Sequence, residues 1–292
     1  MKITRRQFVT RTACGVAGAL AAPGSVYAAE AGAPKLRLSA CDWSLKARGP
    51  EGLEIAQRVG LDGLEISAGS ATDTLDVAKP EVRQAYKEYA AKTGVIVSSV
   101  AMGFLNGAPL AEDPRGPAWL EQTIDAAKDL GVGVVLLAFF GKGDLRHKDE
   151  LKADCVDVVV ERLKEAAPRA QQAGLVLGLE NTLSGKDNLA ILDRVGSDAV
   201  QVYYDTGNST YNGYDVPAEI RALGKERICQ FHFKDGRYLL GQGKVDMEAV
   251  AEAIKAIEYE GWLVLETSIP SKDRDADFQA NAAYVRRLFG LA

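Results

Sequence analysis

The sequence predicts one α/β domain, a single (β/α)8 barrel of the TIM type, over residues 36–292. Eight short apolar segments rich in β-branched residues are strand candidates, and they alternate with amphipathic helical segments along this stretch. Strands that alternate with helices pair in parallel, and near-continuous apolar strands belong to a sheet covered on both faces. A chain of 292 residues also accommodates a barrel of about 250 residues.

Each expected strand is followed by a segment that can form a helix. The strands are expected at 36–43, 63–69, 95–104, 132–140, 175–181, 200–208, 228–235 and 262–268. The clearest helical patterns have apolar residues three and four apart and end at a glycine, at 79–94, 117–131, 246–261 and 275–290. The alternative fold is an open doubly wound sheet, which needs a glycine-rich phosphate loop after its first strand. The segment ACDWSLKARG at 40–49 is not such a loop.

The first 28 residues resemble a twin-arginine export signal. Arg5 and Arg6 precede Phe8, an Ala/Gly-rich apolar segment follows, and cleavage is expected after Ala28. A disordered basic start before a short helix is the alternative interpretation. The apolar part is too short and too weakly apolar to anchor the chain in a bilayer, so no membrane anchor is expected after cleavage. We therefore expect a signal peptide at 1–28, a linker at 29–35 and a periplasmic or exported barrel.

The composition excludes several classes of protein. The formal net charge is −5, and removal of the signal, which holds four basic residues and no acidic one, would lower it to about −9. Without a basic stretch interleaved with aromatic residues, nucleic acid is not an expected partner. Cys41, Cys155 and Cys229 are widely spaced, so neither a zinc knuckle nor a disulfide framework is expected, and all three are expected to be buried.

The carboxyl ends of the expected strands carry the residues suited to chemistry. In a barrel of this type the active site lies at these ends, where the sequence has Glu65, Glu180, Asp205, His232 and Glu266. The last four come from consecutive strands, and three converging carboxylates would repel one another unless a cation lay among them. The sequence therefore predicts one divalent metal ion, and this ligand set does not choose between Mn, Mg, Co and Zn. The alternative for His232 is a hydrogen-bonded core histidine.

The motifs around these residues resemble those of a known family. The segments LGLEN, YYDTGN, FHFKD, LGQGKVD and LVLETS are similar, in this order, to motifs of the xylose-isomerase-like TIM-barrel family of sugar phosphate isomerases and epimerases. The resemblance covers residues 36–290 and implies a divalent metal held by Glu180, Asp205, His232 and Glu266. Endonuclease IV is a relative with several zinc ions held by many histidines, and a chain with two histidines and an acidic balance does not fit it.

The sequence departs from one branch of this family. Its ketose 3-epimerases carry a histidine three residues after the aspartate and an acidic residue six residues after the first glutamate. Asn208 and Lys186 stand at these positions here. The resemblance therefore supports the metal site and does not carry over 3-epimerase activity directly.

Such a metal site can support proton transfer next to a sugar carbonyl through an enediolate. Glu180 and Glu266 are expected to act as base and acid in a sugar isomerase or epimerase, with Lys234 as electrostatic partner of the developing oxyanion. A salt bridge is the alternative role for Lys234. Asn208 is expected to orient a ligand or a substrate hydroxyl. Glu65 is assigned to substrate binding or to the support of a ligand, with a salt bridge at the barrel rim as the alternative.

Apolar side chains near the strand ends either form a wall for a small carbohydrate or pack in the core; these are Trp43, Met102, Phe139 and Phe140. Two other functions remain open: a lyase or hydrolase that cleaves 3-keto-glycosides after the same proton removal, and a non-catalytic metal-containing sugar-binding protein. The sequence does not decide whether the sugar is phosphorylated, free or a keto-glycoside. The oligomeric state is also open, with a homo-oligomer among the alternatives.

The export signal gives the first prediction. The pair Arg5→Lys and Arg6→Lys should retain the precursor in the cytoplasm, because the twin-arginine pair is what the export route is expected to read. Cell fractionation with mass spectrometry should find a wild-type mature chain that begins near Ala29. Exported protein with an intact Met1 would contradict the prediction.

Overall fold

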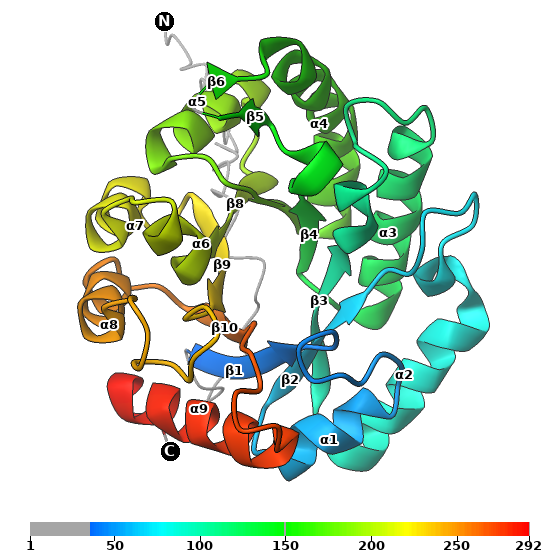
Figure 1. Cartoon of the computed structure of the whole chain (residues 1–292). Coiled ribbons are helices and arrows are strands. Elements are labelled where there is room, and N and C mark those ends of the chain that lie inside the picture. Colours follow the sequence, from blue (N-terminus) through cyan, green and yellow to red (C-terminus); the bar gives the residue numbers. More distant parts are fainter. Residues whose placement is uncertain (1–35, 149, 292) are drawn as a thin grey trace, which may run out of the picture.

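A closed barrel of parallel strands forms the centre of the computed structural model, which describes residues 36–148 and 150–291 (Figure 1). The strands follow one another around the ring in the order β1, β10, β9, β8, β7, β4, β3, β2. This ring confirms the expected (β/α)8 barrel. The expected signal peptide and linker lie outside the described residues. The strands are β1 (Leu36–Cys41), β2 (Gly63–Ser67), β3 (Ile96–Met102), β4 (Val134–Ala138), β7 (Val176–Glu180), β8 (Val200–Asp205), β9 (Ile228–Phe233) and β10 (Gly261–Leu265).

The helices surround this barrel on its outside, as Figure 1 shows. Gly94, Gly131 and Gly290 follow three of the expected helices in the left-handed conformation, which ends a helix at little cost for glycine. The helices are α1 (Gly52–Arg58), α2 (Pro80–Thr93), α3 (Gly116–Leu130), α4 (Ala153–Ala173), α5 (Gly185–Val195), α6 (Thr206–Tyr211), α7 (Val216–Leu223), α8 (Met247–Ala256) and α9 (Arg274–Phe289), with short 3-10 turns η1 (Asp76–Ala78), η2 (Gly103–Asn106) and η3 (Gly141–Gly143). None of the helices in the described part of the chain combines the length and the apolar character that a membrane span requires.

Several local features differ from the pattern of the sequence. The expected strand at 200–208 ends at Asp205, whose side chain caps α6, and the one expected at 95–104 ends at Met102, where η2 begins. Helix α8 ends at Ala256 and not at Gly261, because Glu258 takes a left-handed conformation and Gly261 already begins β10. The connection between β4 and α4 contains a small antiparallel hairpin of β5 (Arg146–His147) and β6 (Glu150–Leu151). Strands this short have too few residues to show a period of two in the sequence.

Alternate residues of each strand face two separate cores. On β4, Val134, Leu136 and Ala138 pack inside the barrel. Val135 and Leu137 pack between the barrel and the helices. This period of two determines which polar residues reach the interior. The free cysteines follow the expected burial in part, since Cys41 and Cys229 are buried and Cys155 is half-buried.

The alternation also predicts a packing-sensitive glycine. Gly178 on β7 faces the barrel interior, where an added Cβ would lie 2.6 Å from the Cys229 Sγ and 3.1 Å from the Tyr203 Cβ. Gly178→Ala should lower the free energy of unfolding by about 1–3 kcal/mol, measured by urea denaturation, because the closed barrel has no room for the methyl group. The matched control is Gly103→Ala, where an added Cβ meets no atom within 4 Å. Equal stability of both variants and the wild type would contradict this account.

Candidate functional site

Four potential ligands converge at the carboxyl ends of neighbouring strands. Glu180 ends β7, Asp205 ends β8, His232 lies in β9 and Glu266 directly follows β10. Asp205 and His232 are register partners across β8 and β9. One ligand atom from each of the four residues lies within 4.8 Å of the others, so the described structure contains a candidate metal-binding site. The sequence assigned these four residues to a metal, and the structure brings their side chains together.

The position of each carboxylate follows from the strand period. On β7 the inward-facing row is Val176, Gly178 and Glu180, and on β10 Trp262 and Val264 precede Glu266 on the same face. The lower members of each row are apolar or glycine and fill the barrel. The last member of each row reaches the end of the barrel, where the four potential ligands meet.

His232 is central to this group. Its Nδ1 lies 2.8 Å from the Glu180 Oε1 and 3.7 Å from the Glu266 Oε2. The ring is fully buried, and the Tyr203 ring packs beside it with 4.5 Å between the centroids. Nδ1 therefore points to the carboxylates that the sequence assigned to the metal.

Lys234 bridges the carboxylates of Asp205 and Glu266. Its Nζ donates to the Asp205 Oδ2 at 3.1 Å and to the Asn208 Oδ1 at 3.2 Å, and it forms an ion pair with the Glu266 Oε2. Burial alone would lower the pKa of Lys234, but Asp205, Glu266 and Glu180 raise it above its usual value. Lys234 is therefore an ammonium ion that compensates part of the negative charge.

The carboxylates still exceed the positive charge available to them. Burial is the main cause that raises the pKa of Glu180 to about 7, and Glu266 and Asp205 add to it although His232 acts in the opposite direction. The pKa of Asp205 is also raised by burial, in spite of Lys234. Buried carboxylates in this state are stabilised by a divalent cation. The donor set of oxygens with one imidazole nitrogen suits such an ion.

A cavity of about 570 Å³ opens directly on this group. Glu180, Glu266, Lys234 and Asn208 line it beside Trp43, whose Nε1 donates to the Glu266 Oε1 at 3.1 Å. The size and the mixture of apolar and polar groups are typical of a small-molecule site. Further polar and aromatic lining residues, which the sequence did not single out, are Arg48, Ser67, Ser70, Phe104 and Asn106.

The expected apolar wall is present only in part. Phe140 lines the cavity together with Trp43. Met102 and Phe139 instead belong to the core between barrel and helices, because the strand period turns them outward. For these two residues the core-packing alternative is correct.

Glu65 does not lie where a substrate could contact it. It is fully buried inside the barrel and does not line the cavity. Its Oε1 lies 2.8 Å from the His232 Nε2, and its Oε2 accepts hydrogen bonds from the Ser99 Oγ at 2.5 Å and the Tyr203 hydroxyl at 2.7 Å. The expectation of substrate binding is therefore revised, because Glu65 lies on the far side of the imidazole from the carboxylates of the site.

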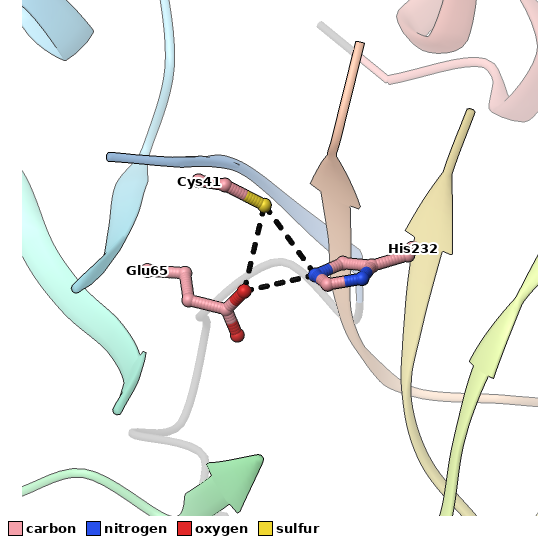
Figure 2. A group of neighbouring side chains, drawn as sticks. All are labelled: Cys41, Glu65 and His232. Carbon is pink, nitrogen blue, oxygen red and sulfur yellow. Dashed lines mark hydrogen bonds and ion pairs between the residues drawn. The ribbon is translucent and has the colours of Figure 1, made fainter. Parts of the chain in front are cut away.

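Sequence reasoning missed the residues around Glu65. Cys41 is the register partner of Glu65 across β1 and β2, and its Sγ lies 3.5 Å from the Glu65 Oε1 (Figure 2). Tyr203 could have been found, since it precedes Asp205 by two residues and therefore faces the same side of β8. Ser99 carries no comparable signal, because serine is common in strands of every kind.

The glycine-containing motif LGQGKVD has a structural role. The Asp235 carboxylate is buried and accepts hydrogen bonds from the backbone N–H groups of Gly241, Gly243 and Val245. An added Cβ at Gly243 would lie 2.1 Å from the Asp235 Oδ1, so glycine is required there for close approach. Asp246 then caps α8 through the Ala249 N–H. The motif shapes the loop between β9 and α8.

Comparison with known proteins gives relatives among sugar epimerases. The chain is 26% identical over 230 residues to the 2-epi-5-epi-valiolone 7-phosphate 2-epimerase of Actinoplanes sp., covering 75% of this chain and 82% of that enzyme. It is 30% identical over 200 residues to the L-ribulose 3-epimerase of Mesorhizobium japonicum, covering 64% and 65% of the two chains. The solved structure of the 3-keto-D-glucoside 4-epimerase of E. coli has a similar fold, with a TM-score of 0.72 at 16% identity over 86% of this chain and 99% of that chain.

The family comparison covers most of the barrel. A family model described as xylose isomerase-like TIM barrel matches residues 53–288. This range contains the four potential ligands and the strands that carry them. The chain therefore belongs to the xylose isomerase-like TIM barrel family.

Proposed function

We propose that this protein is a divalent-metal-dependent sugar epimerase or isomerase that acts by proton transfer through an enediolate. One observation carries the proposal: three carboxylates and one imidazole from four adjacent strands converge within 4.8 Å beside a cavity that two of the carboxylates line. The epimerase activities named for two relatives support the same reaction class.

The metal is assigned to Glu180, Asp205, His232 and Glu266. A divalent ion bound there supplies Lewis-acid polarisation of an adjacent substrate oxygen. Lys234 and the Asn208 backbone N–H hold the Asp205 carboxylate, and the Trp43 indole holds that of Glu266. These contacts orient the carboxylates before substrate arrives. Mn, Mg, Co and Zn all suit the donor set.

Glu180 and Glu266 are assigned to proton transfer. Both line the cavity, and they come from β7 and from the end of β10, with β8 and β9 between them. One glutamate can remove a proton from the carbon next to a sugar carbonyl, and the other can return a proton at another face or position. The Lys234 ammonium, which also lines the cavity, stabilises the negative charge that develops on the substrate oxygen.

The proposed substrate is a small carbohydrate bound between Trp43 and the polar lining residues Glu180, Lys234 and Glu266. Asn208 lines the cavity and is assigned to bind a substrate hydroxyl, while its Oδ1 also accepts a hydrogen bond from Lys234. The twin-arginine pattern at Arg5 and Arg6 supports action outside the cytoplasm, where free sugars and oxidised glycosides are more accessible substrates than sugar phosphates. On a 3-keto-glycoside, the same proton removal can lead to loss of the glycosidic oxygen and so to a lyase.

The metal assignment gives the first prediction for this function. The purified protein should hold about one divalent ion per chain, and His232→Ala or Asp205→Ala should greatly weaken its binding, because each variant removes a ligand from the same ion. Metal analysis of dialysed protein measures this. His147→Ala is the matched control, since His147 is exposed on β5. Full occupancy in both site variants would refute the assignment.

The proton-transfer assignment gives the second prediction. In D₂O the enzyme should exchange the hydrogen next to the carbonyl of a true substrate, and NMR of the product mixture measures this. Glu180→Gln and Glu266→Gln should each lower turnover by a factor on the order of a thousand, because they keep the shape and remove the base. Wild-type turnover in both variants would show that acid and base lie elsewhere.

Product analysis then separates the chemistries. The panel contains free ketoses, ketose phosphates and 3-keto-glucosides. A product with the formula of the substrate supports the isomerase or epimerase, whereas release of an alcohol or a sugar supports the lyase. Binding of a metal and a sugar without any exchange would leave a sugar-binding protein.

A further inference from the structure

A second cluster of polar side chains lies inside the barrel on the other side of His232 (Figure 2). Cys41, Glu65 and His232 come from β1, β2 and β9, and all three are fully buried. The His232 Nε2 lies 2.8 Å from the Glu65 Oε1 and 3.4 Å from the Cys41 Sγ. The proposed function assigns no task to Cys41 or Glu65.

Two hydrogen bonds from buried hydroxyl groups fix the orientation of the Glu65 carboxylate. Its Oε2 accepts hydrogen bonds from the Ser99 and Tyr203 hydroxyls, at 2.5 and 2.7 Å. Both donors are buried: Ser99 lies on β3, next to the strand of Glu65, and Tyr203 lies on β8, on the opposite side of the ring. The remaining oxygen, Oε1, therefore has a defined position from which it meets the imidazole.

The two ring nitrogens of His232 face two different sets of carboxylates. Nε2 meets Glu65, whereas Nδ1 is 2.8 Å from the Glu180 Oε1 and 3.7 Å from the Glu266 Oε2. A neutral imidazole has one N–H donor and one nitrogen lone pair. If Nε2 carries the hydrogen and donates it to Glu65, the Nδ1 lone pair is directed to the proposed metal position.

We infer that Glu65 is the positioning residue of the metal centre: it accepts a hydrogen bond from the His232 Nε2–H and thereby selects Nδ1 as the metal-binding nitrogen. Hydrogen bonds from the second nitrogen of a metal-bound histidine to a carboxylate orient the ring and strengthen it as a ligand. This inference rests on the proposed metal site and adds the residue that prepares its nitrogen ligand.

The cluster could instead hold a second ion between Cys41, Glu65 and His232, since its three ligand atoms also lie within 4.8 Å of one another. Two observations favour the hydrogen-bonded arrangement. Glu65 already accepts bonds from Ser99 and Tyr203, and the cavity that reaches Glu180 and Glu266 is not lined by Cys41 or Glu65. A second ion would also require His232 to bind metal through both nitrogens, which removes the hydrogen that satisfies Glu65.

The first test observes the nitrogens directly in the wild-type protein. The chain contains two histidines, and His147 is exposed on β5. The imidazole nitrogens are isotope-labelled, the protein is loaded with an NMR-active cadmium isotope, and the His147→Gln variant assigns the signals. We expect one cadmium ion, with cadmium coupling at the His232 Nδ1 and a retained hydrogen on Nε2. Coupling at Nε2, or two bound ions, would overturn the inference.

The second test measures the dissociation constant of cadmium by competition with a chelator. Glu65→Ala should raise it about 10–100-fold. Glu65→Gln should raise it less, because an amide oxygen can still accept from Nε2–H while the charge is lost. Leu120→Ala is the control for lost stability. Leu120 is a buried core residue of α3 and belongs neither to this cluster nor to the group of proposed metal ligands.

The outcomes distinguish this inference from the proposed function. Unchanged cadmium affinity in both Glu65 variants would show that Glu65 only forms hydrogen bonds within the core. The same conclusion would follow if Leu120→Ala lost as much cadmium affinity as Glu65→Ala. A wild-type protein that binds no divalent ion would refute the metal site and this inference together. An ion coupled to Nδ1 whose affinity is unchanged in both Glu65 variants would refute the inference alone and leave the metal-dependent reaction intact. An ion held through Nε2 would lie beside Glu65 and Cys41 and would refute the metal site as well.

Discussion

The concentration of buried carboxylates at one end of the barrel is the constraint on which the rest of this site depends. Glu180, Asp205 and Glu266 meet around one imidazole, and Lys234 supplies a single permanent positive charge among them. Burial raises the pKa of Glu180 and Asp205, which expresses the cost of holding their charges away from water. In the proposed enzyme, a divalent cation offsets this cost and takes part in the proton-transfer chemistry.

The barrel makes this arrangement possible because it separates packing from chemistry along each strand. Inward-facing residues in the lower layers, such as Val176 and Trp262, fill the interior, whereas Glu180 at the end of β7 and Glu266 after β10 line the cavity. His232 lies where the two regions meet. One nitrogen faces the acidic site and the other faces Glu65, so the packed interior can control the orientation of a side chain in the site.

Much of the fold and of the site could be predicted because both depend on local sequence patterns. Parallel barrel strands end at the same edge, so Glu180, Asp205, His232 and Glu266 could be brought together from their positions in the strands alone. The same reasoning left the role of Glu65 open between substrate binding, support of a ligand and a salt bridge, because its partners Ser99 and Tyr203 come from other strands. Met102 and Phe139 were undecided because a shift of one residue turns a side chain to the other face.

The sequence by itself determined the alternation of strands and helices, the family motifs and the four residues assigned to the metal, because period, order and residue type are properties of the chain. Only the tertiary structure decided which side of the imidazole each carboxylate occupies. Glu180 ends β7, whereas Glu65 is the middle residue of β2, and closure of the ring brings these two strands to different sides of His232. Closure depends on contacts between distant residues, and no local pattern encodes these contacts directly.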